Sequence, residues 1–211
     1  MNPYYEDDLV TIYHGDCREF LPIVSADVMV TDPPFGIGYL SGHKGSLPRS
    51  IKGDQDVSLR DEVLAAWAPR PAISFGSWKR PRPAGTRALL VWDTGGALGM
   101  GDLRIPWKPS HQEIYVIGHG FTGRRTTDVL RFPPVQSMAK NGRLHPHEKP
   151  VALMEELVKK CPPGVVIDPF MGVGPTLIAA SNLDRRAIGI EVDESYCEKA
   201  ARRLSALREA E

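Results

Sequence analysis

The chain is poor in cysteine and has no long apolar run. Its three cysteines, Cys17, Cys161 and Cys197, lie far apart, without the close pairs typical of metal sites. Because sparse thiols are typical of a reducing compartment, we expect a cytoplasmic protein without disulfide bonds or a bound metal. No apolar stretch approaches the roughly 20 residues that a membrane-spanning helix requires, and the first residues do not resemble a signal peptide. We therefore expect no membrane association.

Length and composition indicate one globular domain over residues 1–211. Of the 211 residues, 42% are hydrophobic and 25% are charged, which is ordinary for a folded protein with one large core. The 26 basic and 26 acidic residues cancel, but residues 41–150 contain 17 Lys and Arg against 9 Asp and Glu. This basic middle favours a nucleic-acid partner. The alternative is a solvated charge asymmetry without a partner.

An acid, two prolines and an aromatic residue follow the first strongly apolar segment. Residues 27–31 are typical of a buried strand, and Asp32-Pro33-Pro34-Phe35 comes directly after it. In open α/β sheets, ligands bind at the carboxyl ends of the strands. There the Asp32 carboxylate and the Pro33 carbonyl can accept the two hydrogens of an exocyclic amine, because the prolines fix the backbone. Phe35 offers a ring face for stacking. The alternative is a strand followed by an ordinary Pro-Pro turn.

A glycine-containing loop lies near the other end of the chain. It follows a predicted strand at residues 165–167, contains Gly172 and Gly174, and precedes a predicted helix. The next predicted strand ends in Glu191, 19 positions after Gly172, close to the offset of about 20 at which an acid reaches ribose hydroxyls. The loop lacks the glycine patterns of nicotinamide and triphosphate sites. A nucleoside cofactor without a polyphosphate fits better, and S-adenosylmethionine is the common one.

Together, these motifs resemble the amino-group DNA methyltransferases of the beta class, whose motif order is permuted. In that family an Asp-Pro-Pro-aromatic motif precedes a cofactor loop that reads Asp-Pro-Phe-x-Gly-x-Gly, and here Asp32 precedes Asp168 by 136 positions. Residues 145–150 resemble the family's His-Pro-x-x-Lys-Pro element, although they can also be a loop before an amphipathic helix. Val173 and Pro175 depart from the small hydroxyl residues that are usual in the cofactor loop. The resemblance covers nearly the whole chain.

The resemblance implies a catalytic set and a cofactor set. The implied catalytic residues are Asp32, Pro33, Pro34 and Phe35. The implied S-adenosylmethionine-binding residues are Asp16, Cys17, Asp32, His145, Lys149, Pro150, Asp168, Pro169, Phe170, Met171, Gly172, Gly174, Thr176 and Glu191. In the family, a Gly-Asp ends the strand that lies beside the cofactor's adenine. The alternative for Asp16 is a helix cap.

The basic middle of the chain contains the predicted DNA contacts. Residues 41–53 are rich in glycine, serine and basic residues and predict a loop that orders over DNA phosphates. Residues 79–83 form a basic turn, and residues 118–144 are interpreted as a reduced target-recognition element. The predicted DNA-binding residues are Lys44, Arg49, Lys52, Arg124 and Arg125. Each of these stretches can equally be an ordinary solvated loop.

The alternation of predicted strands and helices indicates a doubly wound α/β fold. The predicted strands are residues 9–13, 27–31, 88–93, 113–117, 165–167 and 186–191, and the predicted helices are residues 59–66, 151–159, from 177, and 194–207. The resemblance implies the Rossmann-like fold of S-adenosylmethionine-dependent methyltransferases. That fold has a mostly parallel sheet of seven strands, with one antiparallel strand near its edge.

The resemblance implies site-specific methyl transfer to the exocyclic amine of a flipped DNA base. Asp at the first motif position is more typical of N6-adenine enzymes, whereas N4-cytosine enzymes often carry Ser there, so adenine N6 is the predicted target. Neither a metal nor a covalent enzyme intermediate is needed, and a homodimer would help a short recognition region to span its site. The alternatives are an N4-cytosine enzyme, an RNA or protein-amide methyltransferase, and an inactive nucleic-acid-binding relic.

Overall fold

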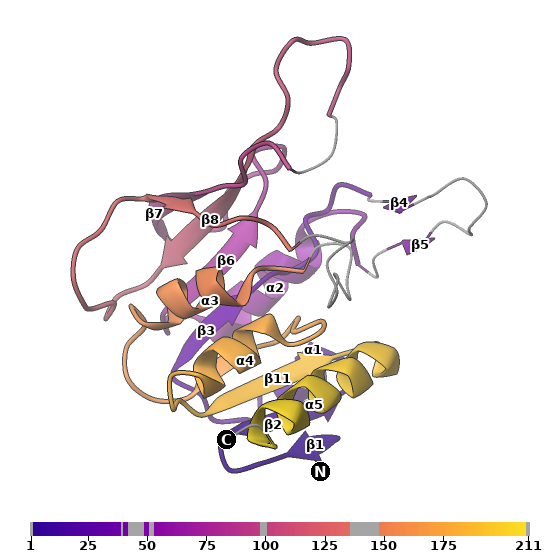
Figure 1. The fold of residues 1–211 in the computed structure, drawn as a ribbon, viewed down its shortest axis with the longest axis vertical. Helices are drawn as coiled ribbons and strands as arrows, with labels where there is room; N and C mark the ends of the chain where they lie inside the picture. The colour runs from indigo at the N-terminus through magenta and orange to yellow at the C-terminus, as the bar shows by residue number, and fades with distance from the viewer. Residues whose placement is uncertain are drawn as a thin grey trace.

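The computed structural model contains one large sheet flanked by helices (Figure 1). The structure describes residues 2–38, 40–41, 49–50, 53–97, 101–135 and 148–209. In these residues nine strands form the sheet: β1 (Tyr5–Glu6), β2 (Val10–His14), β3 (Val28–Thr31), β6 (Ala72–Gly76), β7 (Thr86–Asp93), β8 (His111–Ile117), β9 (Val129–Arg131), β10 (Val166–Asp168) and β11 (Ala187–Glu191). A separate antiparallel pair consists of β4 (Leu40–Ser41) and β5 (Arg49–Ser50). The helices are α1 (Cys17–Phe20), α2 (Ser58–Trp67), α3 (Val151–Val158), α4 (Pro175–Ser181) and α5 (Glu194–Arg208).

The sheet is mixed, and most of its strands point in one direction. The strand order is β1-β2-β11-β10-β3-β6-β8-β7-β9. Strand β8 runs antiparallel to both of its neighbours and β1 runs antiparallel to β2, whereas the other neighbouring pairs are parallel. The predicted doubly wound fold is confirmed. The predicted count of seven strands is wrong, because the short strands β1 and β9 are added as the outermost strands on the two sides of the sheet.

The sequence pattern does not predict β6, although this strand lies in the middle of the sheet. Pro71 precedes it, Ser74 interrupts its apolar residues and Gly76 ends it, so it lacks the continuous apolar run that indicates β3. All five residues of β6 are buried. A Cβ at Gly76 would lie 2.3 Å from the ring of Tyr115 on the neighbouring β8, so the close approach of these strands requires glycine.

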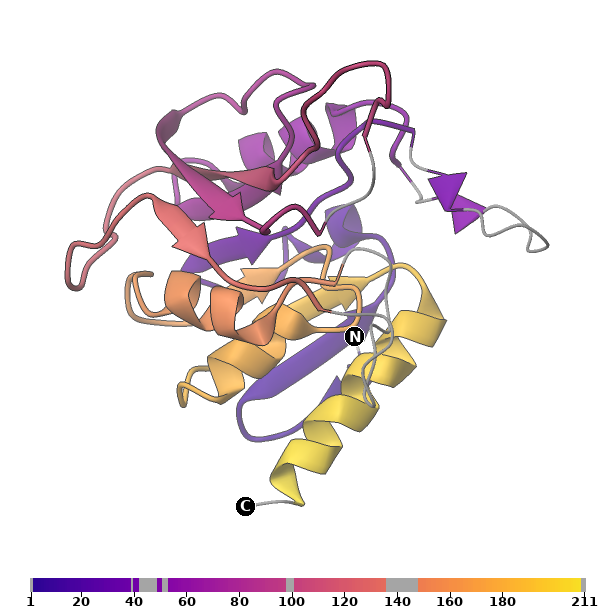
Figure 2. The same cartoon turned by 45° about the horizontal axis from the view of Figure 1, so that its top comes forward.

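Helices cover both faces of the sheet (Figures 1 and 2). Helices α3, α4 and α5 pack on one face, whose core includes Val28 and Val30 of β3. Helices α1 and α2 pack on the other face, whose core includes Met29. This alternation is the two-residue period of a strand, and burial on both faces is typical of a central parallel strand. The strand that precedes Asp32 is therefore held rigidly.

The parallel strands define two edges of the sheet. We call the edge at which β2, β3, β6, β7, β10 and β11 end the carboxyl edge, and the opposite one the amino edge. Because β8 is antiparallel, it enters at the carboxyl edge with His111 and leaves at the amino edge with Ile117, which pairs with Ala72. Residues 94–97 and 101–110, between β7 and β8, therefore lie on the side of the carboxyl edge, and residues 118–128 begin at the amino edge.

Helices α3 and α5 begin at the predicted residues. Asp193 caps α5, because its side chain accepts a hydrogen bond from the amide of Ser195. Gly174 adopts a left-handed conformation that turns the chain into α4, and Pro175 occupies the first turn, where no amide hydrogen is needed. None of the helices in the described ranges is long and apolar enough to cross a membrane.

Candidate active site

The carboxylate of Asp32 lies at the carboxyl edge, directly after β3. Its Oδ2 accepts a hydrogen bond from Nζ of Lys149, a side chain that is only 2% exposed. Its Oδ1 is buried and has no hydrogen-bond partner in the part of the chain that the structure describes. Burial raises the pKa of Asp32, and the Lys149 ammonium partly opposes this rise. Among the residues that the structure describes, Asp32 thus combines one charged partner with one unpaired acceptor.

Three aromatic rings surround the ammonium of Lys149. Its Nζ lies 4.8 Å from the ring centroid of Phe75, 5.5 Å from that of Phe35 and 6.0 Å from that of Trp92. Phe75 and Trp92 meet edge to face, and Trp92 Nε1 donates a hydrogen bond of 2.8 Å to the carbonyl of Phe132. Ring faces attract a cation and so offset part of the cost of burying it. We call Phe35, Phe75 and Trp92 the aromatic cage; Phe75 and Trp92 are absent from the sequence-based prediction.

A turn before α2 fixes the segment that follows the Asp-Pro-Pro-Phe motif. The amide of Gly36 donates a hydrogen bond of 2.6 Å to Oδ1 of Asp54, and Arg80 donates to the carbonyl of Gly36. Gly36 has a φ of +69°, and a Cβ there would lie 2.4 Å from the backbone of Asp56. Glycine is therefore required at this position, and the motif cannot shift without moving the turn.

Asp168 ties the cofactor loop to the strand that carries Asp32. Its Oδ1 accepts hydrogen bonds from Thr31 Oγ1 at 2.7 Å and from the Phe170 amide at 3.1 Å, and its Oδ2 accepts from Thr176 Oγ1 at 2.5 Å. Burial raises the pKa of Asp168 to about 6 despite these donors, and the nearby charge of Asp32 adds to the rise. The two motif loops are therefore mechanically and electrostatically coupled.

Glu191 organises the glycine loop from the end of β11. Its Oε2 accepts a hydrogen bond of 3.0 Å from the amide of Gly172, and its Oε1 accepts one of 2.8 Å from the amide of Asp193. Burial raises the pKa of Glu191. Gly172 has a φ of +53°, and no atom of the described chain lies within 4 Å of the position that a Cβ would take. The loop therefore presents open space beside a carboxylate that still has lone pairs for hydroxyl groups.

Asp16 and Cys17 lie beside Glu191 at the end of β2. The amide of Gly15 donates a hydrogen bond of 2.9 Å to the Glu191 carbonyl. Asp16 caps α1 by accepting from the Arg18 amide at 3.0 Å, and it pairs with the Arg18 guanidinium, which lowers the pKa of Asp16. Burial raises the pKa of Cys17 to about 12, so this thiol is no nucleophile. The helix-cap alternative for Asp16 is present in the structure, and a contact with adenine stays a prediction.

The structure gathers most of the predicted catalytic and cofactor residues at the carboxyl edge. These are Asp16, Cys17, Asp32, Pro33, Pro34, Phe35, Lys149, Pro150, Asp168, Pro169, Phe170, Met171, Gly172, Gly174, Thr176 and Glu191. His145, Lys44 and Lys52 lie outside the described residues, as does the side chain of Arg49. Thr31 joins the site through Asp168, although it was not in the predicted set.

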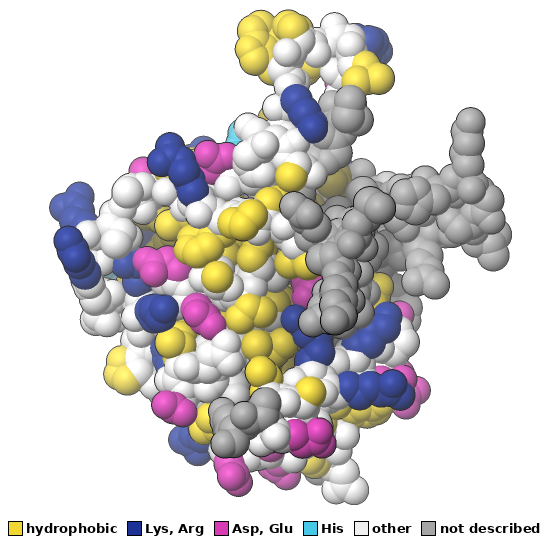
Figure 3. Space-filling model, viewed as in Figure 1, with side chains coloured by type: hydrophobic (Ala, Val, Ile, Leu, Met, Phe, Trp, Pro, Cys, Tyr) yellow, Lys and Arg dark blue, Asp and Glu magenta, His cyan; other side chains and the backbone are white. Residues whose placement is uncertain are grey.

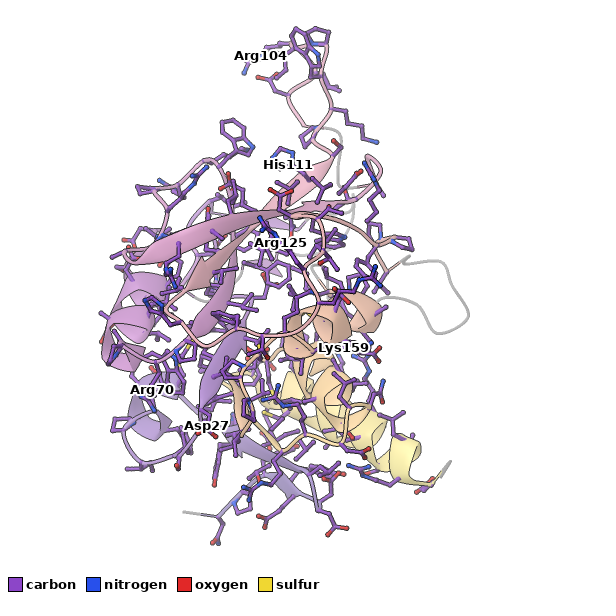
Figure 4. The ribbon with its side chains drawn as sticks, turned by 90° about the vertical axis from the view of Figure 1, so that its left-hand side faces the viewer. Asp27, Arg70, Arg104, His111, Arg125 and Lys159 are labelled. Carbon is purple, nitrogen blue, oxygen red and sulfur yellow. The ribbon has the colours of Figure 1, made fainter. Side chains whose placement is uncertain are left out.

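Arg124 and Arg125 are not gathered with the other predicted residues. They follow the amino edge of β8, and their segment contacts the end of α3, where Lys160 Nζ donates a hydrogen bond of 2.8 Å to the carbonyl of Arg124. The labelled Arg125 and Lys159 lie far from the labelled Arg104, which stands at the outer end of residues 101–110 (Figure 4). Contact of Arg124 and Arg125 with the DNA around the target base stays a prediction, and their position argues for a small contribution.

The strand order and the two motif loops at one edge define a Rossmann-like methyltransferase. Residues 90–202 match the family model described as DNA methylase, with N6 and N4 amino groups as targets. This span covers more than half of the 211 residues, so the chain belongs to this family of amino-group DNA methyltransferases. The predicted family is therefore confirmed.

Similar proteins agree with this assignment. The type II methyltransferase M.ScaI of Streptomyces caespitosus is 28% identical over 97% of this chain and 84% of its own length. The crystal structure of the M1.HpyAVI–SAM complex has a TM-score of 0.63 at 22% identity and covers 92% of this chain and 100% of that chain. PvuII DNA methyltransferase, which is cytosine-N4-specific, has a TM-score of 0.68 at 15% identity and covers 94% of this chain and 87% of that chain. At these identities the two structures show the fold alone.

Members of this family take their methyl group from S-adenosylmethionine, and the site fits that cofactor. The open space beside Gly172 can admit a ligand against the loop backbone. The Glu191 carboxylate lies beside this loop and can accept hydrogen bonds from ribose hydroxyls, and the region of the Asp32–Lys149 pair, between the two motif loops, can receive the reacting end. No cluster of histidine, cysteine or acidic residues suited to a metal ion occurs within the described ranges.

Proposed function

We propose that this protein methylates the N6 amine of an adenine that is flipped out of duplex DNA. The observation that carries the proposal is Oδ1 of Asp32, a buried acceptor without a partner among the described residues, at the carboxyl end of a central strand. A buried acceptor without a donor is unfavourable, and an exocyclic amine supplies the missing N–H. The protein is thereby prepared for an amine before the base arrives.

Asp32 and the carbonyl of Pro33 act together on the target amine. The lone pair of an exocyclic amine is delocalised into its ring, so the free amine is a poor nucleophile. Acceptance of both N–H bonds favours a pyramidal nitrogen with a localised lone pair, and the carboxylate charge stabilises the nitrogen as it becomes cationic. Because Lys149 holds Oδ2, the carboxylate is fixed with Oδ1 available to the amine.

Phe35 provides the surface on which the flipped base stacks. It is partly buried and belongs to the aromatic cage, so its ring orientation is restrained by the Lys149 ammonium. A base that has left the duplex loses stacking energy, and an aromatic face returns part of it. Phe35 and Asp32 thus recognise the face and the edge of the same base.

The cofactor roles follow from the loop geometry. Glu191 accepts hydrogen bonds from the ribose hydroxyls, and the backbone at Gly172 lies against the cofactor. Asp16 contacts the adenine moiety, while Asp168 and Thr176 hold the loop in shape. S-adenosylmethionine, when bound, supplies an electrophilic sulfonium methyl group, and the protein adds no covalent step of its own.

Adenine is favoured over cytosine because the first motif position is Asp32. Within the resembling family, Asp is more typical of N6-adenine enzymes and Ser of N4-cytosine enzymes. The second candidate is N4 of cytosine, which the fold of the cytosine-N4-specific PvuII enzyme accommodates. Both targets present two N–H bonds on an aromatic ring, so the same acceptors serve either base.

Transfer of a labelled methyl group identifies the target. The protein is incubated with labelled S-adenosylmethionine and unmethylated duplex DNA, and the digested nucleosides are separated. We expect label in N6-methyl-2′-deoxyadenosine. Label in N4-methyl-2′-deoxycytidine would instead identify cytosine as the target base, and the absence of label from DNA would overturn the proposal. In Asp32→Ala, we expect the rate to fall at least about a thousandfold while S-adenosylmethionine still binds, because the acceptor and its charge are lost.

A further inference from the structure

The connection between β7 and β8 ends in an exposed apolar tip. Leu103, Ile105 and Trp107 are 78%, 54% and 77% exposed. The connection that carries them stands out from the molecule at the upper end of Figure 1, and apolar and basic side chains adjoin at that end in Figure 3. We call residues 101–110 the tip. Large apolar side chains grouped in this way mark an interaction surface, because their exposure to water is unfavourable.

The tip has a defined backbone. At its base, the amide and the hydroxyl of the buried Thr94 both donate hydrogen bonds of 2.8 Å to the carbonyl of Ser110. The side chain and carbonyl of Asp102 accept from the amides of Arg104 and Ile105, which closes a turn. Pro106 and Pro109 further restrict the chain. The apolar side chains are therefore presented by a restrained turn.

The position and charge of the tip fit DNA. It rises from the carboxyl edge, the same edge as Asp32, so a duplex that offers a base to Asp32 passes on this side of the sheet. Its charged residues are Arg104, Lys108 and one acid, Asp102, which pairs with Arg104 at 2.7 Å. Both partners of this pair are partly or fully exposed, so the pair is weak and can exchange for a phosphate contact.

A second copy of the chain fits the tip less well. A stable protein interface buries about 800 Å² on each partner, with a closely packed apolar centre. Three side chains on a projecting turn give a narrow surface, which suits insertion into a groove better than flat packing against another protein. Apolar wedges of this size enter the minor groove and partly unstack a base step.

We propose that the tip is a DNA wedge: Leu103 and Trp107 pack against bases beside the target site, and Arg104 and Lys108 contact the phosphates. The wedge rests on the proposed function only in that the substrate is duplex DNA. By unstacking neighbouring bases, it lowers the cost of flipping the base that Asp32 receives.

Binding to fluorescently labelled, unmethylated duplex DNA tests the wedge. We expect the double variant Leu103→Ser, Trp107→Ala to raise the dissociation constant for DNA about tenfold or more, since each lost base contact weakens binding. Ile23→Ser removes a side chain that is 61% exposed in the turn between α1 and β3, and it serves as the matched control with unchanged binding. Thermal melting and S-adenosylmethionine binding report whether the variants are folded.

The charge of the tip is tested separately through salt. Plotted against the logarithm of the salt concentration, the logarithm of the affinity falls with a negative slope. In Lys108→Ala the magnitude of this slope should decrease by about one, as expected for one lost phosphate contact. The control Arg186→Ala removes an exposed cation that precedes β11 at the amino edge, and its slope should equal that of the wild type.

The outcomes separate the wedge from the proposed function. Unchanged DNA affinity in the double variant overturns the wedge, whichever base the wild type methylates. Failure of the wild-type protein to bind duplex DNA overturns the wedge as well. Sedimentation that changes from dimer to monomer in the double variant, with DNA affinity per subunit unchanged, identifies a second copy as the occupant and also overturns the wedge. Weaker DNA binding supports the wedge even where labelled methyl appears in cytosine.

Discussion

Lys149 donates a hydrogen bond to Oδ2 of Asp32 across 117 positions of sequence, from within the aromatic cage. The pair connects the strand that ends in the Asp-Pro-Pro-Phe motif with the start of α3. Burial raises the pKa of Asp32, and the buried Lys149 ammonium opposes this rise, so Lys149 favours the ionised carboxylate. Lys149 is therefore a positioning residue for Asp32, whatever contact it also makes with the cofactor.

Removal of the Lys149 charge should move the pH dependence of methyl transfer. In the proposed mechanism Asp32 accepts the amine hydrogen as a carboxylate, so activity should be lost as the pH falls through the pKa of Asp32 in the folded protein. Burial raises this pKa and Lys149 lowers it, so in Lys149→Met the pKa rises further and the acid limb of kcat shifts to higher pH. We expect Lys149→Arg to restore part of the wild-type profile. An acid limb at the same pH in Lys149→Met would show that Lys149 does not act through Asp32.

The buried Asp168 should give the fold a measurable pH dependence. Its pKa is about 6 in the folded protein and about 4 in an unfolded chain, so the folded state holds the proton more tightly. The stability that protonation contributes is complete below about pH 4 and is lost as the pH rises to about 6. Relative to Asp168→Asn, the wild-type free energy of unfolding should therefore fall over this range by about 1–3 kcal/mol. Urea unfolding of both proteins at several pH values measures this difference. A difference in the free energy of unfolding that does not change with pH would contradict the prediction.

Two glycines of the cofactor loop should respond differently to alanine. Both have positive φ, so each substitution strains the backbone by about 1–2 kcal/mol. At Gly174 the added Cβ would also lie 3.1 Å from the Cβ of Ala200, so Gly174→Ala should destabilise the fold more than Gly172→Ala. At Gly172 the Cβ enters open space, so Gly172→Ala should mainly weaken S-adenosylmethionine binding. Melting temperature measures the loss of stability, and calorimetric titration measures the loss of S-adenosylmethionine affinity. If the two variants lost equal stability and equal affinity, the different roles assigned to Gly172 and Gly174 would be refuted.

Glu191 should affect cofactor affinity more than turnover. In Glu191→Gln one acceptor becomes an amide donor that faces either the Gly172 amide or the Asp193 amide, and the ribose loses a charged acceptor. We expect KM for S-adenosylmethionine to rise about tenfold or more, with kcat at saturating cofactor reduced much less. Glu194→Gln, in the first turn of α5, is the matched control. A fall in kcat without a change in KM would place Glu191 outside the ribose site.

The parts of the fold that the sequence predicts are those whose signal is local. The run before Asp32 is buried on both faces, and its first three residues, Val28, Met29 and Val30, are apolar, so β3 is visible in the sequence. Strand β6 is equally buried, but Ser74 and Gly76 interrupt its apolar pattern. Glycine is needed at position 76 because of the Tyr115 ring on the neighbouring strand, which the sequence of β6 alone does not show. The short strands β1 and β9 contain too few residues to show a period. The count of strands therefore depends on tertiary contacts.

The candidate site shows the same division. The motifs identify Asp32, Asp168 and Glu191 because each lies at, or directly after, the carboxyl end of a predicted strand. Phe75 and Trp92 carry no such signal, since an aromatic residue in a strand is ordinary core until Lys149 is placed between them. The positions of residues 101–110 and 118–128 depend on the direction of β8, which its apolar pattern does not encode.

The order of the strands in the sheet has a consequence for synthesis of the protein. Strand β2 pairs with β11, and β3 pairs with β10. Two strands that are synthesised early therefore pair with strands that are synthesised much later. Until then, β1 is the only sheet neighbour of β2, and β6 is the only sheet neighbour of β3, among the described strands. A partly made chain therefore exposes unpaired strand edges, which favour mispairing with other chains. The proposed base-binding part around Asp32 is therefore synthesised well before the glycine loop and Glu191, and the proposed cofactor site is complete only once β11 has been made.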